Sequence, residues 1–428
     1  MVRIGSICSI CSICSIRQEE PIDTSTTRTH VARMLTLFVL AHWGHHLLSS
    51  IIPPLLPYIR DEFEIGVTQA GALFSAFTIA YGVSQLPAGW LADRIGRRAL
   101  ILLGVSGVAI WGILAGLSPT YWVMIVFMVM LGVFGGGYHP SSAPLVSSQV
   151  EAKRRGWALG IHQIGGTTSN LSAPLIAAGL ATLLGWRSAF VIPGAVVVVL
   201  GIVLYVLIGR SGPQASQVVK TPMTPMTPNL AEAKPGSRAG LSRLATYMII
   251  GTAGQVFILS TIAFASLFAV DRLGQSEGLA AALPFMVYLG GMPAGPLAGY
   301  VSDRVGAGRM LIVAGLVAGP VIYLMSLVTS VWTSIPVLLA LGALVFTLMP
   351  VSELYIINHT GEANRSTVLG IYYAASRGGS GFLTLGIGYL IERAGFGSAF
   401  AIAGSTMLAI AAGSVLFLWL QRRTGSTG

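Results

Sequence analysis

The stretch GWLADRIG at residues 89–96 decides the fold, because it returns as GYVSDRVG at residues 299–306. The two copies begin 210 residues apart, and three further blocks keep the same distance. These blocks pair Pro140 with Pro350, Arg155 with Arg365, and Gly185 with Gly395. Self-similarity at a fixed distance indicates two related halves within one chain.

The composition places both halves in a lipid bilayer. Of the 428 residues, 54% are apolar and only 9% are charged, with a mean hydropathy of +0.77, whereas a soluble domain carries about 25% charged residues. Crossing about 30 Å of hydrocarbon takes about 20 apolar helical residues. Twelve such stretches lie near residues 34–57, 67–91, 99–117, 122–148, 157–183, 188–208, 244–269, 279–301, 309–329, 332–357, 366–391 and 397–420. We therefore expect an all-α membrane protein with twelve transmembrane helices in two six-helix bundles.

The repeat distance fixes how the halves are oriented. Six spans per repeat is an even number, so the halves are parallel repeats about an axis along the membrane normal and enclose a cleft. The expected parts are a low-complexity tail (1–32), an N-terminal bundle (33–210), a linker (211–243), a C-terminal bundle (244–422) and a short tail (423–428). The linker is rich in Pro, Ser and Thr, a composition that cannot build a core.

The net charge of +10 is explained by the orientation of the chain in the membrane rather than by binding to nucleic acid. Twenty of the 25 Lys and Arg residues fall on one side of the predicted spans, and cytoplasmic loops of membrane proteins carry such an excess. Both termini and the linker are therefore expected to be cytoplasmic in a multi-pass inner-membrane protein. The first 30 residues lack the apolar core of a secretory signal. We expect a monomer whose partners are the lipid bilayer and a small-molecule substrate.

The three cysteines lie close together near the N-terminus. The segment CSICSIC spans residues 8–14 and places Cys8, Cys11 and Cys14 three residues apart. Such spacing can hold a soft metal ion, but the triplet-periodic run is more typical of a low-complexity extension.

Residues 89–98, GWLADRIGRR, resemble the signature Gly-x-Leu-Ala-Asp-Arg-x-Gly-Arg-Arg of the major facilitator superfamily, and the resemblance covers residues 33–422. It implies that Asp93 holds a cytoplasmic gate by pairing with positive groups of the other half, while Arg94 and Arg97 lock neighbouring loops. A solvated loop that only sets topology is the alternative. The candidate gating residues are Gly89, Asp93, Arg94, Gly96, Arg97, Asp303 and Arg304.

A second resemblance lies in GGYHPSS (136–142) and GIHQIGG (160–166). These segments are similar to the fosmidomycin-resistance branch of drug exporters. Two departures weaken the case for antiport: Met128 stands where many exporters carry a basic residue, and their Gly-Pro pattern in span 5 survives only as Gly165, Gly166 and Pro174.

Polar side chains within the predicted spans are the candidate functional groups, because each costs a few kcal/mol on insertion scales. His42, His45 and His46 share one face about halfway along span 1. Histidine titrates near neutral pH, so one of them, His45 first, is a candidate proton carrier. The same trio could bind a transition metal, or could simply be hydrogen-bonded into helix packing.

In the second half, Gln255 occupies the repeat position of His45, and Glu353 and Arg377 lie in spans 10 and 11. An Arg inside hydrocarbon needs a counter-charge, which either Glu353 or an anionic substrate can supply. The candidate substrate and proton-coupling residues are His42, His45, His46, His139, His162, Gln163, Gln255, Glu353, Tyr372 and Arg377.

These features favour a secondary active transporter that exports a small organic solute by alternating access. The chain has no metalloprotease motif or nucleophile elbow, so we do not expect an enzyme. It also has no nucleotide-binding loop. We therefore expect no cofactor, and a proton gradient as the energy source. The alternatives are uptake of an anionic carboxylate or phosphonate by proton symport, transition-metal transport, and a sensor that binds solute without moving it.

Overall fold

The computed structural model describes residues 24–148, 150, 154–209, 238–361 and 365–424. All regular secondary structure in these ranges is helical. Nine helical segments of the described residues are long and apolar enough to cross a bilayer. One of them, residues 367–421, contains two expected spans, and the expected spans 2 and 5 form helices of 29 and 30 residues that are more polar. The twelve expected spans are thus all helical.

The N-terminal half contains spans 1 to 6. Its elements are α1 (Thr24–Ser50), α2 (Ile52–Phe63), α3 (Val67–Ile95), α4 (Arg97–Leu102), the π-helix η1 (Leu103–Gly107), α5 (Val108–Gly116), α6 (Tyr121–Gly135), α7 (Tyr138–Ser148), α8 (Arg155–Leu184) and α9 (Trp186–Gly209). Span 1 breaks between α1 and α2 just before Pro53 and Pro54, which cannot donate backbone hydrogen bonds. Span 4 breaks at Gly136 and Gly137.

The C-terminal half contains spans 7 to 12. Its elements are α10 (Arg238–Ile262), α11 (Ala265–Asp271), α12 (Glu277–Ala282), α13 (Phe285–Val305), α14 (Ala307–Met325), α15 (Val331–His359) and α16 (Arg365–Thr424). Span 7 breaks between α10 and α11, at the level of the break in span 1. Gly395 has a non-helical backbone (φ 77°, ψ 166°) and divides α16 into spans 11 and 12.

The internal repeat is visible in the backbone at two pairs of glycines. Gly96 and Gly306 have φ angles of 86° and 91°, and Gly185 and Gly395 have φ angles of 84° and 77°. Each pair is separated by 210 residues. Only glycine adopts such angles without strain, so the two halves make the same tight turns with the same residue.

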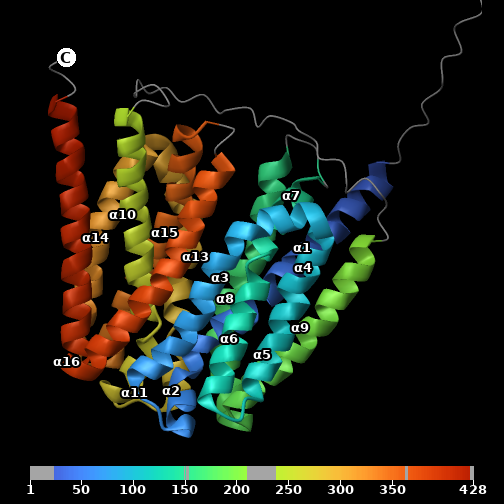
Figure 1. The fold of residues 1–428 in the computed structure, drawn as a ribbon, viewed down its shortest axis with the longest axis horizontal. Helices are drawn as coiled ribbons and strands as arrows, with labels where there is room; N and C mark the ends of the chain where they lie inside the picture. Colours follow the sequence, from blue (N-terminus) through green and yellow to red (C-terminus); the bar gives the residue numbers. More distant parts are fainter. Residues whose placement is uncertain (1–23, 149, 151–153, 210–237, 362–364, 425–428) are drawn as a thin grey trace, which may run out of the picture.

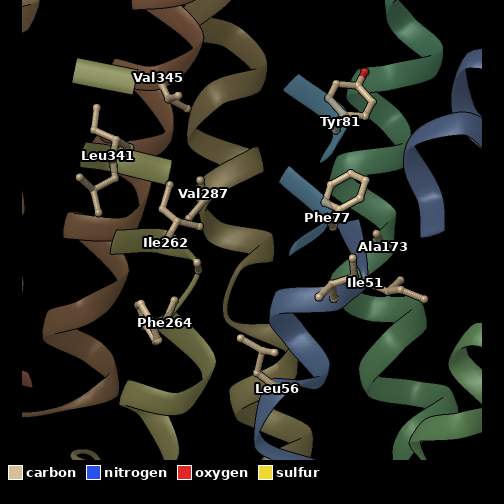
Figure 2. Close-up of a cluster of buried hydrophobic side chains, with 14 of the residues drawn as sticks. Ile51, Leu56, Phe77, Tyr81, Ala173, Ile262, Phe264, Val287, Leu341 and Val345 are labelled. Atoms are coloured by element: carbon tan, nitrogen blue, oxygen red, sulfur yellow. The ribbon is translucent and has the colours of Figure 1, made fainter. Parts of the chain in front are cut away.

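The halves lie side by side, with α10 and α13–α16 in one group and α1 and α3–α9 in the other (Figure 1). They meet where α3 packs along α16, and where α8 packs on α12 and α13. The start of α1 and the end of α16 lie at the same end of the bundle, and α2 and α11 at the opposite end (Figure 1). Buried apolar side chains from both halves, including Ile51 and Phe264, line the region between them (Figure 2).

The glycine turns give a direct test of the repeat. A Cβ atom at Gly96 or Gly306 would meet nothing within 4 Å, so replacement by alanine imposes backbone strain alone. We expect Gly96→Ala and Gly306→Ala each to lower stability by about 1–3 kcal/mol, measured by thermal unfolding of the purified protein. Gly413→Ala is the matched control, because Gly413 is helical and equally unhindered; equal effects at all three positions would contradict the prediction.

Candidate functional site

Five histidines converge inside the N-terminal half. Helix α1 carries His42, His45 and His46, α7 carries His139, and α8 carries His162. The ring centroids of His42 and His162 are 4.3 Å apart, those of His45 and His46 are 4.8 Å apart, and those of His46 and His139 are 5.2 Å apart. The three neighbours expected on one face of span 1 are therefore joined by the two histidines of spans 4 and 5. We call these five residues the histidine cluster.

Backbone carbonyls orient three of the rings. Nδ1 of His42 lies 2.9 Å from the carbonyl oxygen of His162, and Nδ1 of His162 lies 3.2 Å from that of Phe38. Nδ1 of His45 lies 2.6 Å from the carbonyl oxygen of Gly104. A ring nitrogen facing a carbonyl must carry the proton and donate it, so in the neutral form Nε2 of each ring holds a lone pair.

The Nε2 atoms of the histidine cluster have different environments. Nε2 of His45 lies 3.3 Å from the hydroxyl of Tyr81, which can donate to it. Nε2 of His46 lies 3.2 Å from Nε2 of His139. In contrast, Nε2 of His42 and of His162 are buried without a hydrogen-bond partner among the described residues.

The C-terminal half brings together its own polar group. Gln255 on α10 is buried, and its side-chain amide donates to the hydroxyl of Tyr372 on α16. Glu353 on α15 lies beside the hydroxyl of Tyr373. Its Oε1 is buried with no hydrogen-bond partner in the described part of the chain.

Arg377 on α16 lies where these two groups meet. Its guanidinium is close enough to interact electrostatically with His45, His46 and His139 and with Tyr372 of its own half. Arg60 and Arg187 pair with carboxylates, but Arg377 forms no ion pair with a carboxylate of the described ranges. Glu353 was one of the two partners considered for Arg377, and these two side chains, both within those ranges, do not form an ion pair.

Gln163, also expected in the cleft, is exposed on α8. Of the candidate gating residues, Arg94, Gly96, Asp303 and Arg304 are exposed and Arg97 is half-buried, while the side chains of Gly89 and Asp93 lie outside the described residues. The Arg304 guanidinium lies 4.0 Å from the ring centroid of Tyr300.

Arg98, at the end of the motif at residues 89–98, fastens the loop to a neighbouring span. Its guanidinium donates two hydrogen bonds to the carbonyl oxygen of Tyr205 on α9 and lies 3.8 Å from the centroid of that ring.

Sequence reasoning missed a group of polar contacts at the end of the bundle where α2 and α11 lie. Arg60 on α2 donates to both carboxylate oxygens of Asp271 on α11, at 2.7 and 2.6 Å, and to Asp61 at 2.7 Å. We call these three residues the outer latch, because they join the two halves. The repeat held a signal for it, since Asp61 and Asp271 are 210 residues apart.

A second contact supports the outer latch. The backbone N–H of Thr68 on α3 donates to Oε1 of Glu392 on α16 at 2.9 Å, and its hydroxyl donates to Oε2 at 2.6 Å. Both carboxylate oxygens are thus held by the start of α3. The two halves are therefore fastened at this end by charged and polar contacts.

Two parallel six-helix halves with polar groups at their junction define a polytopic α-helical membrane transporter. The sequence profile of the Major Facilitator Superfamily matches residues 38–292 and 244–427. The chain belongs to this superfamily of secondary transporters and is not an enzyme.

Known proteins support the same assignment. The multidrug resistance protein MdtG of Salmonella arizonae is 29% identical to this chain over 323 residues, which cover 73% of this chain and 78% of the relative. The protein of the same name from Salmonella typhi has the same identity and coverage.

Solved structures show the likeness of fold. A POT family transporter crystallised with a thioalcohol-conjugated peptide superimposes with a TM-score of 0.75 at 16% identity, covering 91% of this chain and 96% of the other. A bacterial homologue of the human lysosomal transporter Spinster, inward-facing and occupied, gives a TM-score of 0.69 at 18% identity, covering 93% and 97%.

The outer latch yields a prediction about access. An ion pair at the protein surface contributes up to about 1 kcal/mol, and a loss of that size shifts a two-state equilibrium about fivefold. We expect Arg60→Ala to increase labelling of a Phe77→Cys probe by a membrane-impermeant maleimide several-fold, in a background with Cys8, Cys11 and Cys14 replaced by serine. The exchanged pair Arg60→Asp with Asp271→Arg should restore slow labelling, and unchanged labelling in Arg60→Ala would contradict the role of the latch.

Proposed function

We propose that this chain exports a small organic solute across the inner membrane in exchange for protons, with both termini in the cytoplasm. The observation that carries the direction of transport is the similarity to multidrug resistance proteins over 73% of the chain. The predicted excess of Lys and Arg on one side of the spans supports the orientation. The buried polar groups at the junction of the halves support a central binding site.

The outer latch supports an alternating-access cycle. Arg60 with Asp271 and Thr68 with Glu392 hold the halves together at one end. These contacts lie at the surface rather than in the apolar core, so they can exchange for water at low cost. Release of an exported solute requires them to part while the cytoplasmic ends close.

Glu353 is the group best placed to carry the coupling proton. It is a carboxyl group within span 10, it has no cation partner among the described residues, and one of its oxygens has no hydrogen bond there. A carboxyl group in this position can accept a proton without breaking an ion pair. His45, the carrier favoured from sequence, already uses both ring nitrogens, so protonating it requires the Tyr81 hydroxyl to turn away.

The role of Glu353 is tested by separating proton coupling from solute movement. We expect Glu353→Gln, which keeps the shape but fixes a neutral side chain, to abolish the response of transport to a pH gradient while downhill exchange of solute continues. The measurement is uptake into inverted and right-side-out vesicles, with and without the gradient. Glu64→Gln is the control, because Glu64 is an exposed acid at the end of α2. A pH response that persists in Glu353→Gln would rule out this carboxyl group.

Symport of an anionic metabolite is the second candidate, and the position of Arg377 favours it. The guanidinium lies at the junction of both halves without a carboxylate partner among the described residues. Such a group binds carboxylate or phosphonate through two parallel hydrogen bonds. In this case, transport would run inward with protons rather than against them.

A thermal-shift screen distinguishes the two solute classes. If the substrate is an anion, phosphonates or carboxylates should raise the unfolding temperature of the unsubstituted protein, and Arg377→Lys should reduce that shift because lysine cannot bind in the bidentate mode. Lipophilic cations should give the shift instead if the protein is a cation exporter, with little dependence on Arg377. Arg309→Lys is the matched control, since Arg309 is exposed at the start of α14.

A further inference from the structure

We propose that His42, His46 and His139 form a binding site for one divalent transition-metal ion of the zinc class. One ring nitrogen from each residue lies within 4.8 Å of the others. The inference goes beyond the proposed export of an organic solute, which requires no metal. It also differs from the trio expected from sequence, because His139 on α7 takes the place of His45.

Two of the three ligand atoms already have the separation that a metal requires. Zinc binds imidazole nitrogen at about 2.0–2.1 Å with tetrahedral angles, which places two such nitrogens about 3.3–3.4 Å apart. Nε2 of His46 and Nε2 of His139 are 3.2 Å apart. His42 lies one helical turn before His46 on the same face, and one of its ring nitrogens lies within 4.8 Å of the nitrogens of the other two rings.

The third ligand is oriented by the backbone. Nδ1 of His42 donates to the carbonyl oxygen of His162, and metal-binding histidines are commonly fixed by such a bond from the other ring nitrogen. The remaining nitrogen, Nε2, therefore presents its lone pair. His42 is 2% exposed, and this Nε2 has no hydrogen-bond partner among the described residues. Leaving a buried acceptor of this kind unpaired destabilises the fold, and coordination of a metal ion would offset that loss.

Ordinary packing explains less of the histidine cluster. An N–H···N hydrogen bond between His46 and His139 would satisfy those two rings but would leave Nε2 of His42 buried and unpaired. His45 is excluded as a ligand in this arrangement because its Nε2 faces Tyr81. The contact with Tyr81 removes His45, and among the remaining histidines of the cluster the distances select His42, His46 and His139.

The ligand set indicates an exchangeable ion rather than a structural one. Three histidines with an open fourth position are typical of zinc sites that bind water or a further ligand, whereas structural sites use four protein ligands. His46 and His139 are half-buried rather than fully enclosed. Imidazole binds a metal ion in its neutral form, so the three ligands leave the charge of the ion uncompensated. Arg377 adds positive charge nearby, and the fourth ligand is therefore expected to be water or a small anion.

The test measures metal content directly, without any transport assay, so its failure is distinct from failure of the export proposal. The full chain, purified without a histidine tag and with Cys8, Cys11 and Cys14 replaced by serine, is equilibrated with zinc chloride and analysed by mass spectrometry for metals. We expect one zinc ion per chain. His46→Asn and His139→Asn should each weaken zinc binding at least tenfold, and His359→Asn, outside the cluster on α15, should leave it unchanged.

X-ray absorption at the zinc edge of the protein with all its histidines provides a readout that does not depend on variants folding. We expect three imidazole nitrogens at about 2.0–2.1 Å. Absence of stoichiometric zinc, a zinc shell without imidazole, or undiminished binding in both His46→Asn and His139→Asn would overturn the proposal.

Discussion

Within a bilayer, every buried polar group must find its partner inside the protein, and this requirement organises the centre of the molecule. His42 and His45 of span 1 meet it at Nδ1, where each ring donates to a backbone carbonyl oxygen of another span. The carbonyl that receives His45 belongs to Gly104 in the π-helix η1, where the regular α-helical pattern is interrupted. A π-turn of this kind often marks a functional position in a helix. Gly104 also lets Tyr138 approach closely, since a Cβ atom there would lie 2.7 Å from the Cβ of Tyr138.

The two halves share a backbone but carry different chemistry at matching positions. Gln255 and Tyr372 stand 210 residues after His45 and His162, and Gln255 donates to Tyr372. One half therefore presents imidazoles, and the other presents an amide, phenols and a carboxyl group. The repeat preserves the bends and turns of the backbone, whereas the side chains that face the junction differ between the halves. This difference is expected when function resides in a site rather than in a fold.

Much of this architecture could be predicted from the sequence because it depends on local periodicity. Apolar stretches of membrane length predicted the spans, and the 210-residue offset identified the glycines that both halves share. The spacing of His42, His45 and His46 was enough to place them on one helix face. The approach of His139 and His162 was not, because it depends on how spans 4 and 5 pack against span 1. For the same reason, Glu353, one of the two partners considered for Arg377, does not pair with it among the described residues, and the contact of Arg60 with Asp271 was missed.

The outer latch contains more negative than positive side chains. A single arginine serves two aspartates, and the position 210 residues after Arg60 is Val270, which offers no second cation. Glu277 lies near Asp61 as well. This rim of the protein therefore carries surplus negative charge, which mobile cations in the surrounding medium will screen over a Debye length of about 8 Å at physiological ionic strength. The strength of the ion pair that joins the two halves at this end is thus coupled to the salt content of the compartment it faces.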